Sequence, residues 1–171
     1  MSTKVFLDTN VVAYAFDPAA SAKRQRARKL MDEYDWVVSW QVVQEFANVA
    51  LHRFAVPMKP VDLADYLELV LWPRCEVFPS LTLYRTAVTL HAKTQYRFYD
   101  SLIVAAALTS GAAVLYTEDL QHRRTIDSLK IENPLSGPVQ NRTETVQNRT
   151  ERLNKTGFLL FRGAIDWLVA V

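Results

Sequence analysis

The sequence predicts an α/β domain of three layers, in which helices flank a mainly parallel central sheet. Short apolar runs, typical of buried strands, recur along the chain. Longer segments, whose apolar residues are spaced as on one face of a helix, separate these runs. This alternation indicates a parallel sheet, because a parallel strand pair needs a long crossover connection. A chain of 171 residues, half of them apolar, fits one domain and is too short for two of ordinary size.

The first half of the chain alternates between predicted strands and helices. In order, these are strand 4–7, helix 21–33, strand 36–39, helix 41–54 and helix 61–72. The first strand stops at Asp8, where the polar sequence Asp-Thr-Asn indicates a turn. Ser21 and Ser39 are suitable N-cap residues for the helices that follow them, and Pro73 ends the helix before it.

The second half of the chain continues the pattern. Its predicted elements are strand 76–78, helix 83–94, helix 101–109, strand 114–116 and strand 130–132. The segment 101–109 is apolar almost throughout, so we expect it to be buried on most sides and to stop at Gly111. The strand 114–116 ends at Thr117-Glu118-Asp119, so another acidic residue stands at the end of a strand.

The composition changes near the end of the chain, so we expect a domain over 1–136 and an atypical tail over 137–171. The sequence Val-Gln-Asn-Arg-Thr-Glu occurs at 139–144 and again at 146–151, and it offers few residues to a core. The apolar segment 157–171 is shorter than the roughly 20 residues that span a bilayer, so we expect no membrane contact. The tail is expected to be flexible or to dock on the domain or on a second chain. A repeat this close is also consistent with a frameshift or read-through.

The overall composition limits the function only weakly. The net charge of +2 permits a nucleic-acid partner without requiring one. Cys75 is the only cysteine, which excludes an internal disulfide, and the first residues lack the basic and apolar regions of a signal peptide. These features favour a cytoplasmic protein.

Four acidic residues are placed where they can meet. Asp8 and Asp119 follow predicted strands, Asp100 begins a helix, and Glu45 lies in an otherwise apolar helix face. Ligands of open α/β sheets bind at the carboxyl ends of the strands, so we expect these side chains to converge there. Two carboxylates about 4 Å apart repel by roughly 4 kcal/mol at an effective dielectric constant near 20. Some of the four must therefore be protonated, be paired with basic side chains, or share a divalent cation.

An oxygen-only ligand set favours Mg²⁺, with Mn²⁺ as the alternative, because hard cations prefer carboxylates and water. The histidines, His52, His91 and His122, lack metal-ligand spacing. A magnesium ion can activate water and stabilise charge on a phosphodiester, so phosphodiester hydrolysis is the expected chemistry. Neighbouring polar residues can orient the ligands by hydrogen bonds; these are Thr9, Asn10 and Thr117.

At these positions the chain resembles the PIN-domain family, and within it the VapC-like toxin ribonucleases of type II toxin–antitoxin systems. The resemblance covers residues 3 to about 135 and lies in four segments that occur in the family's order. These are Phe6-Leu-Asp8-Thr-Asn10 followed by Tyr14, Glu45 in a helix, Tyr99-Asp100-Ser-Leu-Ile-Val-Ala-Ala-Ala107, and Leu115-Tyr-Thr-Glu-Asp119-Leu-Gln-His122 with Asn133-Pro134 downstream. It implies a PIN-like fold, Mg²⁺- or Mn²⁺-dependent cleavage of single-stranded RNA, homodimerisation and inhibition by a cognate antitoxin. The chain departs from the family at Arg123-Arg124, where glycine is frequent, and in its tail.

Several residues have a structural interpretation beside the functional one. Arg97, Arg123 and Arg124 flank the acidic segments and are candidates for binding RNA, whereas the basic run 23–29 is more typical of a solvated helix face. Strand alternation directs Glu118 away from Asp119. The apolar stripe 63–71 suits a core, a dimer interface or an antitoxin groove, and the tryptophans Trp36, Trp40 and Trp72 suit a core or an interface.

The sequence thus predicts a metal-dependent endoribonuclease, the toxin of a toxin–antitoxin pair, with Asp8, Glu45, Asp100 and Asp119 as its catalytic and metal-binding residues. One alternative is a PIN nuclease that processes RNA without an antitoxin. Another is a metal-binding interaction module with weak or no catalysis. A haloacid dehalogenase type of phosphatase is disfavoured, because Asn10 stands where that chemistry needs a second aspartate.

Overall fold

The computed structural model describes residues 3–16 and 21–135. The predicted tail, 137–171, lies outside this part, so the expected domain boundary stays a prediction. None of the described helices is long and apolar enough to cross a membrane.

The centre of the structure is a sheet of six strands in the order β3-β2-β1-β4-β6-β5. The strands are β1 (Lys4–Leu7), β2 (Asp35–Ser39), β3 (Cys75–Val77), β4 (Val114–Tyr116), β5 (Thr125–Ile126) and β6 (Leu129–Glu132). All neighbours pair in parallel except β5 and β6, which are antiparallel. The predicted mainly parallel sheet is confirmed.

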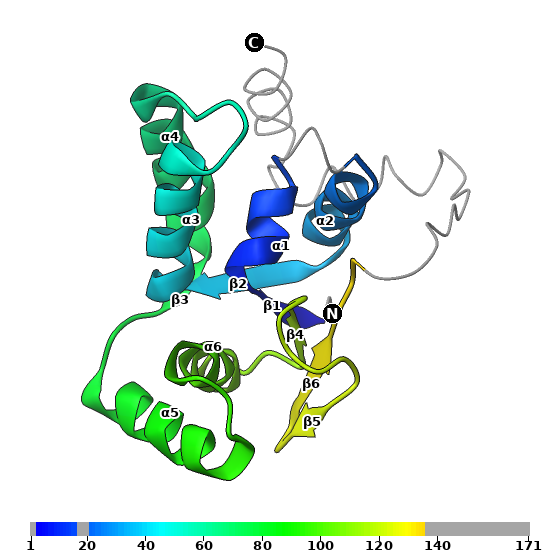
Figure 1. Ribbon diagram of the computed structural model, residues 1–171, viewed down its shortest axis with the longest axis vertical. Coiled ribbons are helices and arrows are strands. Elements are labelled where there is room, and N and C mark those ends of the chain that lie inside the picture. Colours follow the sequence, from blue (N-terminus) through cyan, green and yellow to red (C-terminus); the bar gives the residue numbers. More distant parts are fainter. Residues whose placement is uncertain (1–2, 17–20, 136–171) are drawn as a thin grey trace. The chain divides into compact units, whose positions relative to one another are not determined.

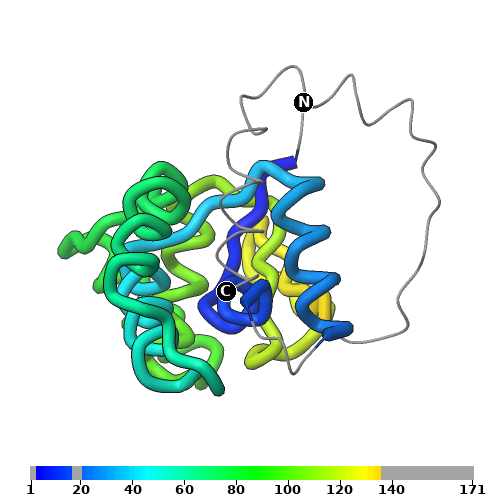
Figure 2. The backbone as a smooth tube through the Cα atoms, turned by 90° about the horizontal axis from the view of Figure 1, so that it is seen from above, coloured from blue at the N-terminus to red at the C-terminus, as the bar shows by residue number. Residues whose placement is uncertain are grey.

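Helices cover both faces of this sheet. They are α1 (Thr9–Tyr14), α2 (Ser21–Glu33), α3 (Trp40–His52), α4 (Pro60–Tyr66), α5 (Leu81–Thr94) and α6 (Phe98–Thr109). Helices α1 to α4 lie on one side and α5 and α6 on the other (Figure 1). Viewed from above, α1 lies between α2 and α3 (Figure 2), and it packs against both. The predicted three-layer α/β arrangement is therefore confirmed.

Burial of apolar side chains explains why these segments pack as they do. Val5, Phe6 and Leu7 of β1 have no exposed surface, as expected for a central parallel strand that is covered on both faces. On the α1–α4 side, the ring of Phe46 lies 5.4 Å from that of Phe16 and 5.2 Å from that of Tyr66. This aromatic cluster joins α3 to α4 and to the end of α1.

The start of α1 differs from the prediction of a turn after the first strand. Asp8 is the N-cap of α1, and its Oδ1 accepts a hydrogen bond of 2.7 Å from the Thr9 amide. The same Asp-Thr-Asn chemistry that forms turns also begins helices, and here it begins a helix directly. The strand β5 was not predicted either, because two residues give no periodicity.

The predicted helix 61–72 is replaced by three consecutive helical types. Helix α4 continues into a π-helix, η1 (Leu67–Leu71), and then into a 3₁₀ turn, η2 (Trp72–Arg74), that contains the expected stop Pro73. Leu63 and Leu71 are buried, whereas Leu69 and Trp72 are about half exposed, at 48% and 55%. The apolar stripe is thus mostly core.

The other predicted helix ends are largely confirmed. Gly111, with φ of 72°, follows α6 in the left-handed region that suits glycine. Ser39 stands at the N-cap position of α3, but its side chain makes no capping hydrogen bond.

Candidate active site

Asp8 lies at the junction of β1 and α1, at the carboxyl end of the central strand. Its Oδ2 accepts a hydrogen bond of 2.6 Å from the Thr117 hydroxyl, which follows β4, and its Oδ1 is bound to the Thr9 amide. Parallel pairing of β1 with β4 brings Leu7 opposite Tyr116, so the residues that follow these strands meet. The side chain of Asp8 is buried, with 8% exposure.

Burial raises the pKa of Asp8 from 3.8 to about 6. The hydrogen bonds from Thr117 and Thr9 lower this pKa, but the nearby charges of Asp119 and Glu45 raise it further. Asp8 therefore keeps a proton at a pH where an exposed aspartate has lost it. A cation close to this carboxylate would reverse the effect, because an opposite charge favours ionisation.

Asn10 connects Asp8 with Asp119. Its Nδ2 donates a hydrogen bond of 2.9 Å to Asp119 Oδ2 and lies 3.4 Å from Asp8 Oδ2. The hydroxyl of Thr117 also accepts a hydrogen bond of 3.2 Å from the Asp119 amide. Asn10 and Thr117 thus hold two of the predicted acids in one hydrogen-bonded group, although Asp119 itself is exposed.

Glu45 reaches the same group from the middle of α3. Its Oε2 accepts a hydrogen bond of 2.6 Å from the Thr9 hydroxyl, and its Oε1 accepts one of 2.8 Å from Gln41 Nε2. Thr9 therefore lies between Asp8, which binds its amide, and Glu45, which binds its hydroxyl. Thr9, Asn10 and Thr117 thus contact the acids that they are predicted to orient, and the orienting role stays a prediction.

Asp100 lies in the first turn of α6. Burial raises its pKa, as do the charges of Asp119 and Glu45, whereas Arg97 and a backbone hydrogen bond lower it. Asp119 and Glu45 thus act on both Asp8 and Asp100. The carboxylates of Asp119 and Glu45 are therefore near enough to both Asp8 and Asp100 to disfavour their ionisation.

The donor set suits a hard divalent cation. Within residues 3–16 and 21–135, none of the four acids is ion-paired with a lysine or arginine. In the same residues, no group of three or more His, Cys, Asp or Glu side chains is arranged to hold a metal ion. The carboxylates are held instead by Thr9, Asn10, Gln41 and Thr117. The chemistry therefore fits the predicted cation, and binding would require the carboxylates to turn toward a common point.

Gln41 is a site residue that the sequence analysis missed. It stands one helical turn before Glu45, and its Nε2 also lies 3.5 Å from the carbonyl oxygen of Tyr99, next to Asp100. Side chains four residues apart on a helix lie next to each other, so the spacing of Gln41 from Glu45 could have identified Gln41 as a neighbour of this acid.

The residues predicted to contact RNA lie in different surroundings. Arg97 and Arg123 are exposed, and Arg97 is the N-cap residue of α6. The guanidinium of Arg124, by contrast, lies 4.8 Å from the centre of the Tyr96 ring and is half-buried. Arg124 thus links the loop after β4 to the α5–α6 connection. Less of the Arg124 side chain is therefore available to contact a ligand.

Glu118, which strand alternation was expected to direct away from Asp119, lies beyond the end of β4 and binds residues of α1 and α2. Its carboxylate accepts hydrogen bonds of 2.7 Å from Tyr14 Oη and 2.7 Å from Lys23 Nζ. The basic face of α2 is therefore more than solvated surface, since Lys23 pairs with Glu118 and Arg28 binds the carbonyl oxygen of Ala15.

Comparisons with known proteins agree with this geometry. The sequence matches the family model described as PIN domain over residues 5–127. No curated protein matches the chain significantly.

Solved structures show where the same fold occurs. A toxin–antitoxin complex from Klebsiella pneumoniae has a TM-score of 0.57 at 17% identity, covering 76% of this chain and 97% of that one. FitAcB from Neisseria gonorrhoeae has a TM-score of 0.53 at 19% identity, covering 76% and 97%. VapBC2 from Rickettsia felis, bound to a DNA fragment from its promoter, has a TM-score of 0.53 at 19% identity, covering 77% and 98%. At these identities the likeness is one of fold.

Proposed function

Because the chain belongs to the PIN domain family, we propose that it is a metal-dependent endoribonuclease that hydrolyses phosphodiester bonds in single-stranded RNA. PIN domains are generally nucleases. One observation carries the proposal: the charges of Asp119, which follows β4, and Glu45, on α3, raise the pKa of both Asp8, which follows β1, and Asp100, on α6. None of these four acids is ion-paired with a lysine or arginine in the described ranges. Structural carboxylates are normally paired or solvated, whereas nucleases gather them to bind cations.

Asp8, Glu45, Asp100 and Asp119 are proposed to hold Mg²⁺, or Mn²⁺ in its place. Such an ion supplies charge for the developing phosphodiester transition state and lowers the pKa of water. Burial favours the protonated form of Asp8, and Asp8 must lose this proton to bind the ion. The affinity of the protein for the metal should therefore decrease when the pH is lowered below about 6. Before the ion binds, hydrogen bonds from Thr117 and Thr9 keep the Asp8 carboxylate oriented.

We further propose that the protein is the toxin of a toxin–antitoxin pair, a cytoplasmic homodimer that a cognate antitoxin inhibits. The support is the family resemblance of the sequence and the likeness in fold to the toxin–antitoxin complex from Klebsiella pneumoniae. Expression in a bacterial host tests it: wild type should arrest growth, Asp8→Asn should not, and a small neighbouring reading frame should restore growth. Light scattering of the purified protein should give twice the mass of the chain.

Cleavage assays with acid-to-amide variants test the nuclease. The variants are Asp8→Asn, Glu45→Gln, Asp100→Asn and Asp119→Asn, with Asp65→Asn, an exposed carboxylate on α4, as the matched control. Each site variant should slow cleavage of labelled RNA in Mg²⁺ or Mn²⁺ by at least about tenfold, roughly 1.4 kcal/mol of barrier, while the control cleaves as wild type. Cleavage that continues unchanged in chelator would refute the metal mechanism. Metal binding without cleavage of any RNA would instead support an interaction module.

A further inference from the structure

Three aromatic rings are exposed beside the first turn of α6. Tyr99 is 68% exposed, and Phe98 and Tyr84 are each 37% exposed. The rings of Tyr84, on α5, and Phe98 are stacked with centroids 6.5 Å apart, and the ring of Tyr99 meets that of Phe98 edge-on at 5.7 Å. Contiguous exposed apolar surface of this kind commonly marks a binding site.

The chain that leads up to these rings carries positive charge, and Asp100 is the first acid after it. Between residues 77 and 99 there is no aspartate or glutamate, whereas Arg85, Lys93 and Arg97 are present. None of these three cations is ion-paired within the described residues. Arg85 also lines a surface hollow together with Tyr84 and Phe98. We call Tyr84, Arg85, Arg97, Phe98 and Tyr99 the aromatic–arginine surface.

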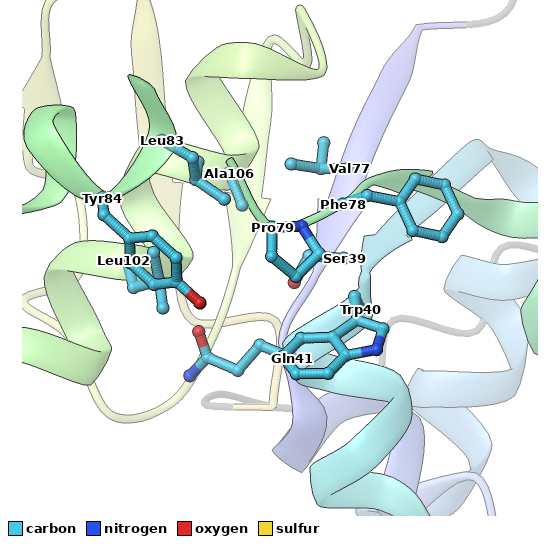
Figure 3. A pocket seen from close by; sticks show the side chains of 10 residues that line it. All are labelled: Ser39, Trp40, Gln41, Val77, Phe78, Pro79, Leu83, Tyr84, Leu102 and Ala106. Atoms are coloured by element: carbon cyan, nitrogen blue, oxygen red, sulfur yellow. The ribbon is translucent and has the colours of Figure 1, made fainter. Parts of the chain in front are cut away.

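This surface adjoins the acids through Gln41. Phe98 and Tyr99 immediately precede Asp100, and Gln41 Nε2 contacts the Tyr99 carbonyl oxygen as well as Glu45. Tyr84 and Gln41 line one small pocket between α5 and α3, where the polar ends of the two side chains point toward one another (Figure 3). A strand that has a phosphate at the acids can therefore continue onto the exposed rings.

We propose that the aromatic–arginine surface binds the single-stranded nucleotides next to the cleaved bond. Bases stack on Tyr99 and Phe98, and the guanidinium groups of Arg85 and Arg97 contact backbone phosphates. Aromatic rings beside a positively charged groove are the recurring way in which proteins hold single strands without reading their sequence. The inference rests on the proposed nuclease function, since it assigns the path of that enzyme's substrate.

Charge favours RNA over a second copy of the chain as the occupant. A symmetric dimer through this surface would bring identical patches together. Arg85 and Arg97 would then face like charges, and Asp100, the nearest carboxylate in the sequence, is one of the acids proposed to hold the cation. A polyanion is attracted to these guanidinium groups, and its flat bases match the exposed rings.

Binding of RNA in chelator tests the inference without relying on cleavage. The probe is a fluorescently labelled 12-nucleotide RNA of mixed sequence, followed by anisotropy, with the full-length protein. Phe98→Ala with Tyr99→Ala should weaken binding about tenfold or more, whereas Tyr99→Trp should bind as wild type. Arg85→Ala and Arg97→Ala should each reduce the slope of log affinity against log salt by about 0.7. Trp72→Ala and Arg53→Ala, exposed residues of matched type, should change nothing.

The outcomes separate this inference from the nuclease proposal. If the acids are needed for cleavage but the double alanine variant binds RNA as wild type, the surface is not the RNA path and the inference is wrong. An altered mass in light scattering with unchanged RNA affinity would identify the surface as a contact between copies and would also overturn it. If the surface variants lose RNA binding while no metal supports cleavage, the binding surface stands and the nuclease proposal fails. Circular dichroism must show that each variant is folded.

Discussion

Replacing Asp8 by asparagine should stabilise the protein at neutral pH in the absence of metal. The folded state holds the pKa of Asp8 at about 6, against 3.8 for the free side chain, a difference of about 2.2 pH units (6 minus 3.8). At 1.36 kcal/mol per unit, ionising Asp8 costs the folded state roughly 3 kcal/mol. Asparagine cannot ionise, and its side-chain oxygen can still accept the hydrogen bond from Thr9.

The sign of the pH dependence follows from which state binds the proton more tightly. Because the pKa is raised on folding, the folded protein holds more protons than the unfolded chain between pH 4 and pH 6. The stability contributed by Asp8 is therefore complete below about pH 4, is lost as the pH rises to about 6, and stays lost above it. Relative to Asp8→Asn, the wild type should lose about 3 kcal/mol across this window.

Urea unfolding in chelator, followed by tryptophan fluorescence from pH 4 to pH 8, measures this difference. Only the change in the difference with pH matters, so any constant packing effect of the substitution cancels. Asp65→Asn, exposed on α4, is the control and should show no such dependence. A difference between wild type and Asp8→Asn that is flat from pH 4 to pH 8 would refute the reasoning. Adding Mg²⁺ at pH 7 should stabilise the wild type more than Asp8→Asn, because a ligand of the folded state adds stability.

Three further substitutions probe the residues around this carboxylate. Thr117→Val removes a hydrogen bond that lowers the pKa of Asp8. The midpoint of the pH profile of the cleavage rate should therefore rise by about one to two pH units, and an unchanged midpoint would contradict this. Gln41→Ala removes a hydrogen-bond donor to Glu45. It should lower kcat about tenfold in single-turnover cleavage, with little change in KM or melting temperature. A loss of stability with unchanged kcat would mean that Gln41 only supports the fold. Phe46→Ala empties the centre of the aromatic cluster and should destabilise the protein by about 3–5 kcal/mol in urea unfolding; a cost below about 1 kcal/mol would show that the cluster can collapse around the gap.

The layers of the fold were predictable because short buried runs and helical spacing depend only on which residues face the core. The grouping of Asp8 and Asp119 was predictable for a related reason, since both follow parallel strands that end at the same edge. The start of α1 was not, because Asp8 forms an N-cap from a sequence that is equally typical of a turn. The role of Arg124 also escaped prediction, because its contact with Tyr96 joins segments far apart in the chain.

Details of the carboxylate group depend on distances that no sequence pattern contains. Thr9 uses its amide for Asp8 and its hydroxyl for Glu45, and Gln41 holds the other oxygen of Glu45. The assignment of the four acids to metal binding and catalysis stays a prediction.

The two outer strands of the sheet limit how copies of this protein can associate. β3 has three residues and β5 has two, so neither edge offers a row of unpaired amides and carbonyls long enough to template another strand. β5 also runs antiparallel to its neighbour, next to Asp127 with its positive φ of 52°. Continuation of the sheet from one subunit into the next is therefore disfavoured at both ends. Among the described elements, the helical faces are the surfaces that remain for the proposed homodimer.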